Sequence, residues 1–314
     1  MSGPHLSGAE NLSGTGATSA NSAPWEWEES TWRSIAEQVR AGRSFRKLPW
    51  RDNAEVAVAL SFDADHETPW LRDAETGPAA MAMGEYGARV GVPRILALLA
   101  QHSIPSTFFV PAVSALLHPG EVPSYIDAGH EVALHGWIHE RNTLVSGKVE
   151  RELYMRAADT LERLGGQRPV GIRTPSWDFS SHTIQIIRDM GLRYDSSLMA
   201  DDEPYELLQR GTPTGVVEIP VDWIRDDGAY FVMDRFASLR PYISPREVLQ
   251  IWRAEYHAAR AAGGLFQLTL HPDLIGHRSR MMVLSELLAE IASDGRVWFA
   301  THAQIADHCL ASPD

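Results

Sequence analysis

The sequence predicts an α/β fold in which short parallel strands alternate with helices. From residue 56 onward, short apolar runs rich in β-branched and aromatic residues recur along the chain. Such runs are typical of buried strands, and amphipathic helical patterns lie between most of them. This alternation continues over residues 51–314 and favours either a (β/α) barrel of seven or eight strands or a doubly wound sheet.

The individual elements follow from local patterns. The predicted strands are Val56–Phe62, Thr107–Val110, Glu131–Leu134, Val170–Ile172, Leu192–Tyr194, Val216–Val221, Leu265–Leu270 and Arg296–Ala300. The predicted helices are Pro93–His102, Lys148–Leu164, Pro245 to about Ala262, Ser279–Ser293 and Ala303–Leu310. The third of these helices has the clearest start, because Ser244 and Glu247 form a capping box around a proline at the first helical position.

The N-terminal region differs from the rest of the chain in composition. Residues 1–24 are mostly small and polar, so they have little apolar surface to offset the entropy of ordering, and we expect a disordered tail. Residues 25–50 form an arm with apolar residues at helical spacing up to Val39. The arm contains Trp25, Trp27 and Trp32. We expect it to pack on the barrel of this chain or on that of a neighbour in a homo-oligomer, since three tryptophans expose too much apolar surface to water.

Composition excludes several classes of function. The formal net charge is −13, which leaves no basic surplus for nucleic-acid phosphates. Cys309 is the only cysteine, which excludes an intrachain disulfide and a zinc finger and is typical of a reducing compartment. No apolar run has the length of a membrane span, and residues 1–24 lack the pattern of a secretory signal. We therefore expect a cytoplasmic protein that binds neither nucleic acid nor membrane.

Titratable residues gather directly after the predicted strands, where barrel enzymes build their active sites. They are Asp63, Asp65, His135, His139, Arg173, Asp222 and His271. Each has an ordinary explanation by itself, for example a surface histidine pair or a polar loop. Together they are more informative, because one carboxylate and two imidazoles suit Zn²⁺ in an open catalytic site. A second carboxylate and a separate histidine would then supply a general base and a general acid.

From Val56 to Cys309 the sequence resembles the polysaccharide deacetylase superfamily, the NodB-like or carbohydrate esterase 4 enzymes. Five motifs occur in the family's order. They are Ser61-Phe62-Asp63-Ala64-Asp65, the His135/His139 pair, Arg173-Thr174-Pro175, Asp222-Trp223 and Leu268-Thr269-Leu270-His271. The extra residue between the two acids is similar to a subgroup that includes cyclic imide hydrolases, allantoinase-like proteins and intracellular peptidoglycan deacetylase-like proteins. The resemblance implies a distorted barrel of seven or eight strands.

The resemblance also implies a role for each motif. Asp65, His135 and His139 would hold a divalent metal, most readily Zn²⁺, with Co²⁺ as a substitute. Asp63 would be the general base. Arg173 would steady that base, His271 would be the general acid, and Asp222 would be its partner, with Asp195 as the alternative partner. His66, next to Asp65, would either contact the metal or substrate or face solvent from a loop.

We predict from these roles a metal-dependent hydrolase of a non-peptide C–N bond in a small linear or cyclic amide. One alternative is N-deacetylation of an amino sugar in peptidoglycan or a related glycan. Another is an inactive carbohydrate-binding protein, against which the presence of both a base and an acid speaks.

The segment 223–231 is expected to narrow the site to a pocket, because it follows a predicted strand and is too polar for the core. Tyr230 and Phe231 would stack on a flat ring, with Trp223 as a further substrate contact. Asp227, or its neighbour Asp226, would accept the N–H groups of the substrate. The alternative is a solvated loop whose aromatic residues rest on the barrel rim.

Overall fold

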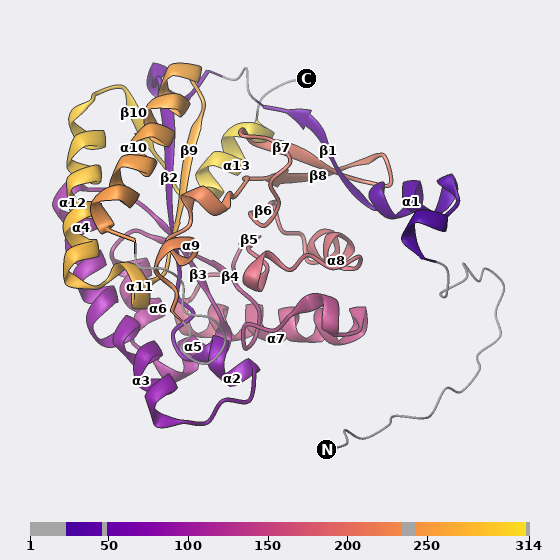
Figure 1. The fold of residues 1–314 in the computed structure, drawn as a ribbon, viewed down its shortest axis with the longest axis horizontal. Helices are drawn as coiled ribbons and strands as arrows, with labels where there is room; N and C mark the ends of the chain where they lie inside the picture. The colour runs from indigo at the N-terminus through magenta and orange to yellow at the C-terminus, as the bar shows by residue number, and fades with distance from the viewer. Residues whose placement is uncertain (1–22, 46–48, 234–242, 312–314) are drawn as a thin grey trace.

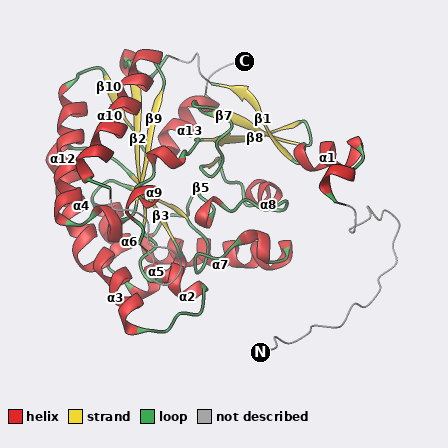
Figure 2. Ribbon diagram, viewed as in Figure 1, coloured by secondary structure: helices red, strands yellow, loops and turns green. Residues whose placement is uncertain are grey.

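A computed structural model describes residues 23–45, 49–233 and 243–311 of the chain. The predicted tail at residues 1–24 lies almost entirely outside the described residues. Figures 1 and 2 show a curled, mostly parallel sheet with helices around its outside. The sheet is a half-barrel, which confirms the distorted (β/α) barrel expected from the sequence.

The sheet contains ten strands among the described residues, in the order β1-β7-β8-β6-β5-β4-β3-β2-β10, with β9 also paired to β2. Their bounds are β1 Val39–Ser44, β2 Val56–Asp63, β3 Thr107–Val110, β4 Glu131–Leu134, β5 Gly171–Ile172, β6 Tyr194–Asp195, β7 Tyr205–Gln209, β8 Thr212–Glu218, β9 Leu265–Leu270 and β10 Val297–Phe299. Only the β1–β7 and β7–β8 pairs are antiparallel. The sequence did not indicate β1 or β7. Strand β1 is largely polar and exposed, and β7 is a short strand in which only Tyr205 and Leu207 are buried.

Longer helices cover the outside of the sheet, and short helices occupy several strand-to-helix connections (Figure 2). The α-helices are α1 Glu29–Ala36, α2 Thr68–Arg72, α3 Pro78–Tyr86, α4 Val92–His102, α5 Ala112–Leu117, α6 Glu121–Asp127, α7 Gly147–Gly165, α8 Thr183–Asp189, α9 Gly228–Phe231, α10 Pro245–Ala262, α11 Pro272–Ile275, α12 Arg278–Ser293 and α13 His302–Leu310. The capping box at Ser244 is present as predicted. Among the described helices, none has the length and apolar character that a membrane span requires.

Strand β2 places its side chains alternately in two cores. Val58 and Leu60 pack in the larger core beneath the outer helices, whereas Ala57 and Ala59 lie in a smaller core within the curled sheet. This alternation follows from the two-residue period of a strand. Both faces of β2 are covered, so all eight of its residues are buried, and the strand appears in the sequence as a nearly continuous apolar run.

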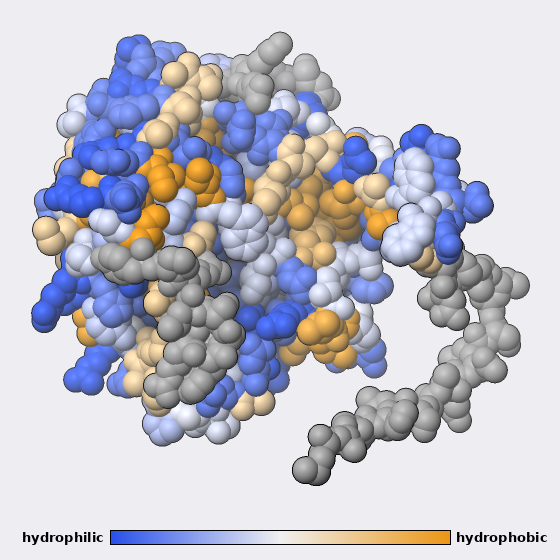
Figure 3. Space-filling model, viewed as in Figure 1, coloured by the Kyte–Doolittle hydropathy of each residue, from blue (hydrophilic) through white to orange (hydrophobic). Residues whose placement is uncertain are grey.

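The N-terminal arm departs from the predicted helix. Helix α1 ends at Ala36, and Val39 instead begins β1, which pairs with β7. Part of the arm therefore belongs to the sheet, while α1, which precedes β1, projects from the body of the protein (Figures 1 and 3). Trp25 is 85% exposed and Trp32 is 46% exposed. Trp25 and Trp32 therefore do not pack on the barrel of their own chain, whereas the later part of the arm does, and the homo-oligomer remains a prediction.

Removing the exposed start of the arm should lower the molecular mass of the assembly, because Trp25, Trp27 and Trp32 would then be missing from an intersubunit contact. We expect a deletion of residues 1–38, which spares β1, to form a smaller species than the full chain in light scattering. A deletion of residues 1–22 is the matched control and should leave the mass of the assembly unchanged apart from the segment removed. A monomeric full-length protein would contradict the prediction.

Candidate active site

The inner face of β2 carries the first acidic residue of the site. Ser61 and Asp63 share this face with Ala57 and Ala59, so the strand period directs both polar side chains into the curled sheet. Asp63 is 2% exposed, and it is the last residue of the strand. A carboxylate at this depth requires bonded partners, since an unpaired buried charge is costly.

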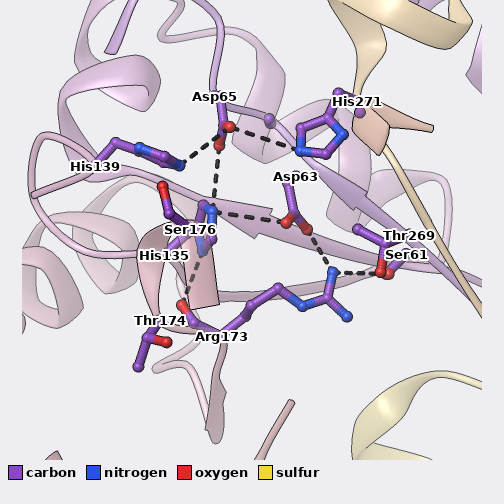
Figure 4. Close-up of polar contacts among 12 residues, drawn as sticks. Ser61, Asp63, Asp65, His135, His139, Arg173, Thr174, Ser176, Thr269 and His271 are labelled. Atoms are coloured by element: carbon purple, nitrogen blue, oxygen red, sulfur yellow. Dashed lines mark hydrogen bonds and ion pairs between the residues drawn. The ribbon is translucent and has the colours of Figure 1, made fainter. Parts of the chain in front are cut away.

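Arg173, which follows β5, is that partner (Figure 4). Its Nη1 donates to Asp63 Oδ1 at 2.6 Å and to Ser61 Oγ at 2.9 Å. Its Nε and Nη2 donate to the carbonyl and hydroxyl oxygens of Ser196, each at 2.9 Å. The guanidinium also lies 4.1 Å from the centre of the Phe109 ring. Because Arg173 is fully buried and bonded in several directions, it fixes the orientation of the Asp63 carboxylate.

Asp65, His135 and His139 form a buried cluster beside Asp63 (Figure 4). Their candidate ligand atoms all lie within 4.8 Å of one another. Asp65 Oδ1 is 3.3 Å from His135 Nε2, and Asp65 Oδ2 is 3.2 Å from His139 Nε2. Burial by itself would raise the pKa of Asp65, but the charges of the two imidazoles hold that pKa well below its usual value.

These residues fit a divalent ion such as Zn²⁺. Asp65 Oδ1 is buried and makes no hydrogen bond, which is unusual for a carboxylate oxygen and leaves it free to bind a cation. His135 Nδ1 lies 2.8 Å from the carbonyl oxygen of Arg173, so Nδ1 carries a proton, and Nε2, which faces the cluster, is the nitrogen that would bind an ion in place of its own proton. One carboxylate and two imidazoles form the ligand set of an open zinc site.

The loop that carries both histidines depends on a tight turn after β4. Gly136 has a φ of +76°, and a Cβ atom there would come within 2.8 Å of Pro175 Cγ. His139 itself has a φ of +61°, an uncommon conformation for a residue other than glycine. Such strain is typical of functional sites, where the surrounding structure holds the residue in place.

His271 borders the same cluster from the end of β9, with its Nε2 3.8 Å from Asp65 Oδ2. Its Nδ1 lies 2.7 Å from Asp227 Oδ1, and its backbone N–H donates to Asp227 Oδ2 at 3.1 Å. Burial would lower the pKa of His271, but the charge and hydrogen bond of Asp227, together with Asp226 and Asp65, raise that pKa well above its usual value. The histidine is thus oriented and kept charged by Asp227.

The predicted pairing of His271 with Asp222 is wrong in the structure. Asp222 caps a short 3₁₀ turn, residues Trp223–Arg225, by accepting the backbone N–H of Ile224 at 3.2 Å. After that turn the chain runs beside β9, where the N–H of Asp227 donates to the carbonyl of Thr269 at 3.2 Å. The turn therefore brings Asp227, rather than Asp222, to the histidine.

Asp195, the alternative partner of His271, is also occupied elsewhere. It accepts the hydroxyl and the backbone N–H of Ser197, and its buried carboxyl lies against that of Glu218. Burial, more than any other factor, raises the pKa of Asp195 to about 6.

The aromatic residues of segment 223–231 do not form the predicted stacking surface. Phe231 is 5% exposed and packs in the outer core, where the guanidinium of Arg280 lies 4.5 Å from its ring centre. Tyr230 is partly buried, and its hydroxyl donates to the carbonyl of Ile224 at 2.9 Å. Tyr230 and Phe231 rest on the barrel, as the alternative expected, but the segment is not a solvated loop, because Arg225, Asp226 and Asp227 are buried. Trp223 alone remains accessible, at 54% exposure, with its ring 4.2 Å from that of Trp177.

Asp227 was predicted to accept N–H groups of the substrate, but it is fully buried and bonded to His271. His66 was expected to contact the metal or substrate or to face solvent. It is instead fully buried, with its Nε2 2.9 Å from Glu121 Oε2.

Arg72 was not singled out in the sequence, yet it contacts the cluster directly. From the end of α2, its Nη1 lies 2.6 Å from His139 Nδ1 and 2.9 Å from the hydroxyl of Ser176. An arginine can only donate, so in this state His139 Nδ1 is unprotonated. If an ion were bound at Nε2, the ring proton would sit on Nδ1. Arg72 could then no longer donate a hydrogen bond to Nδ1, and the contact between the two side chains would have to open. No sequence signal marks Arg72, because its role depends on the reach of a long side chain.

The curled sheet, with carboxylates and imidazoles gathered at its strand ends, places this protein among the (β/α)-barrel enzymes. The comparisons narrow the class. The polysaccharide deacetylase family matches residues 52–194. A solved Mycobacterium smegmatis structure, assigned as a polysaccharide deacetylase, is 38% identical with a TM-score of 0.79, and the match covers 87% of this chain and 95% of that one. The chain belongs to the polysaccharide deacetylase family.

Two further relatives bear on function. The solved structure of an allantoinase, PuuE, is 26% identical with a TM-score of 0.73, and the match covers 84% of this chain and 93% of that one. The peptidoglycan deacetylase of Helicobacter pylori is 28% identical, over 82% of this chain and 97% of its own length. The family is therefore represented among these relatives by enzymes with different named substrates.

The metal content of variants should separate the two neighbouring carboxylates. Wild-type protein loaded with zinc and dialysed should retain about one ion per chain in elemental analysis. Asp65→Asn and His139→Ala should lose most of it, because each removes a ligand atom. Asp63→Asn should retain the zinc, because Asp63 bonds to Arg173 instead. Equal loss of zinc in Asp63→Asn and Asp65→Asn would show that both carboxylates bind the ion.

Proposed function

We propose that this protein is a metal-dependent hydrolase that cleaves a non-peptide C–N bond in a small linear or cyclic amide, such as an imide or a ureide. The ion would be held by Asp65, His135 and His139, most readily zinc, with cobalt as a substitute. One observation carries the proposal: a carboxylate, Asp63, and an imidazole, His271, both border this cluster, and each is fixed by its own buried partner.

The two bordering residues divide the proton transfers between them. A divalent ion, when bound, would act as a Lewis acid and lower the pKa of a bound water molecule. Asp63 keeps Oδ1 on Arg173 and turns Oδ2 toward the cluster, 3.7 Å from His135 Nε2, so Oδ2 is placed to accept a proton. His271 keeps Nδ1 on Asp227 and turns Nε2 to the cluster, so that nitrogen is placed to protonate the departing amine or amide.

A compact substrate is favoured by the contacts beside His139. Arg72 bridges from α2 to Ser176 after β5, and so links two loops on the same side of the cluster. We infer that this bridge leaves less room beside the cluster for a long chain than for a small ring. The similarity to an allantoinase over most of both chains supports this choice.

A second candidate is N-deacetylation of an amino sugar in peptidoglycan or a related glycan. The match to the Helicobacter pylori peptidoglycan deacetylase, which covers almost the whole of that enzyme, favours it. The exposed Trp223 beside Trp177 would suit the apolar face of a sugar ring. The chemistry at Asp63 and His271 would be the same for both candidates.

Activity on a graded set of substrates tests the proposal. The set runs from maleimide-type cyclic imides and hydantoin-type ureides to short N-acetylated amides and chitooligomers, with zinc or cobalt supplied. We expect the small cyclic substrates to be hydrolysed fastest. Strong deacetylation of a glycan oligomer, with no activity on any small amide, would favour the second candidate. Absence of amide cleavage on every substrate would contradict both.

The pairing of His271 with Asp227 gives a second kinetic prediction. Asp227→Asn should lower kcat about 100-fold or more, because the asparagine no longer orients and charges His271 for proton transfer. Any effect of Asp222→Asn should fall on KM rather than on kcat, since Asp222 does not contact His271. Steady-state kinetics on the best substrate of the set measures both. A larger loss of kcat in Asp222→Asn than in Asp227→Asn would contradict the assignment.

A further inference from the structure

A cavity of about 320 Å³ opens at the carboxyl ends of β6 and β8, at the same edge of the sheet as the metal cluster. Its polar lining consists of Asp201, Asp202, Asp222 and Arg225, and three apolar residues complete it. None of these residues belongs to the metal cluster or to its proposed base and acid, and Asp222 contributes to that site only as the cap of the turn Trp223–Arg225. The volume suits a small molecule or one end of a larger one.

Arg225 is the unusual member of this lining. It is 6% exposed, and its Nε is buried without a hydrogen-bond partner. Within the described part of the chain, no ion pair or side-chain hydrogen bond involves its guanidinium. Arg173, the other buried arginine at this edge of the sheet, instead bonds to Ser61, Asp63 and Ser196. A guanidinium is always charged, and leaving one buried and unpaired is costly. Arg225 is therefore placed to pair with a carboxylate brought by a ligand.

Two of the aspartates, Asp202 and Asp222, disfavour a simple anion as that ligand. Both line the same cavity, no ion pair joins either of them to Arg225 among the described residues, and their combined charge exceeds the charge of the arginine. A ligand with only a carboxylate would be repelled by them, and a ligand with only an ammonium would leave Arg225 unpaired. A ligand that carries both a carboxylate and an ammonium group satisfies both parts of the lining.

We propose that this cavity binds the zwitterionic α-amino acid group of a small molecule. The carboxylate would pair with Arg225, for which two parallel hydrogen bonds are the favoured geometry. The ammonium would lie among the aspartate carboxylates, with Asp222 on the same short turn as Arg225. The cavity would thus recognise a carboxylate and an ammonium group that are attached to the same carbon atom.

The position of the cavity connects it to the active site. Arg225 is followed directly by Asp226, whose Oδ1 lies 3.7 Å from His271 Nδ1. Asp222 is followed by Trp223, which packs on Trp177 at the exposed rim. One turn thus contributes to the cavity and to the edge of the active site. This assignment of the cavity as a substrate subsite rests on the proposed function: the substrate would be an amide whose remote end is an α-amino acid.

Binding of small probes to the full-length protein tests the inference without turnover. The probes for isothermal titration calorimetry are glycine, L-alanine and D-alanine, with acetate, methylammonium and acetamide as single-function controls. We expect at least one amino acid to bind about tenfold or more tightly than every control, because two charged contacts form together. Arg225→Gln and Asp222→Asn should each weaken that binding about tenfold or more. Arg278→Gln, which changes an exposed arginine at the start of α12, is the matched control and should bind as the wild type does.

Several outcomes would overturn the proposal. They are the absence of amino acid binding, equal affinity for acetate or methylammonium, and unchanged affinity in Arg225→Gln. Arg225→Lys guards against misfolding, since it keeps the charge but loses the planar fork, and it should bind more weakly than the wild type while melting at a similar temperature. Amide turnover is measured on the same preparations. If amides are cleaved but no amino acid binds, the subsite alone is overturned. If an amino acid binds as described but no amide is cleaved, the cavity is supported as a binding site and the proposed function is contradicted.

Discussion

The buried ion pair between Arg173 and Asp63 links the parts of the site that come from different strands. The arginine side chain holds the carboxylate at the end of β2, while its backbone carbonyl orients His135 from the end of β4. One residue after β5 therefore sets the direction of both the proposed base and a proposed metal ligand. Arg173 can do this because its remaining donors are bonded to Ser61 and Ser196, which leaves the guanidinium little freedom to move.

A similar arrangement recurs on the other side of the cluster. Asp227 bonds to both the ring and the backbone N–H of His271, so a buried carboxylate fixes the imidazole much as a buried arginine fixes Asp63. The proposed base and the proposed acid are thus each held by buried partners, which would favour proton transfer in a defined geometry. The rim of the site is not fixed in the same way. Trp223 remains exposed, and Arg72 donates to His139 Nδ1, a hydrogen bond that a bound ion would alter.

The main features of this architecture could be predicted from the sequence because they depend on local patterns. The apolar run of β2 and the polar residues after β4, β5 and β9 lie where the periodicity of the chain placed them. Asp227 could not be identified as the partner of His271, because the turn capped by Asp222 decides which carboxylate reaches the histidine. Strand β1 and the contacts of Arg72 depend on tertiary packing, which the polar sequence of residues 39–44 and the short helix α2 do not reveal.

The central claim is that the ion and the acid occupy separate clusters. The residues Asp226, Asp227 and His271 also group closely enough to hold a cation, so the two clusters are direct alternatives. Anomalous diffraction at the zinc edge, from crystals soaked in zinc, distinguishes them. We expect one strong peak bonded to Asp65, His135 and His139, with Asp63 still bonded to Arg173 and Asp227 still bonded to His271. A peak bonded to Asp226, Asp227 and His271, with Asp65 unliganded, would contradict the central claim.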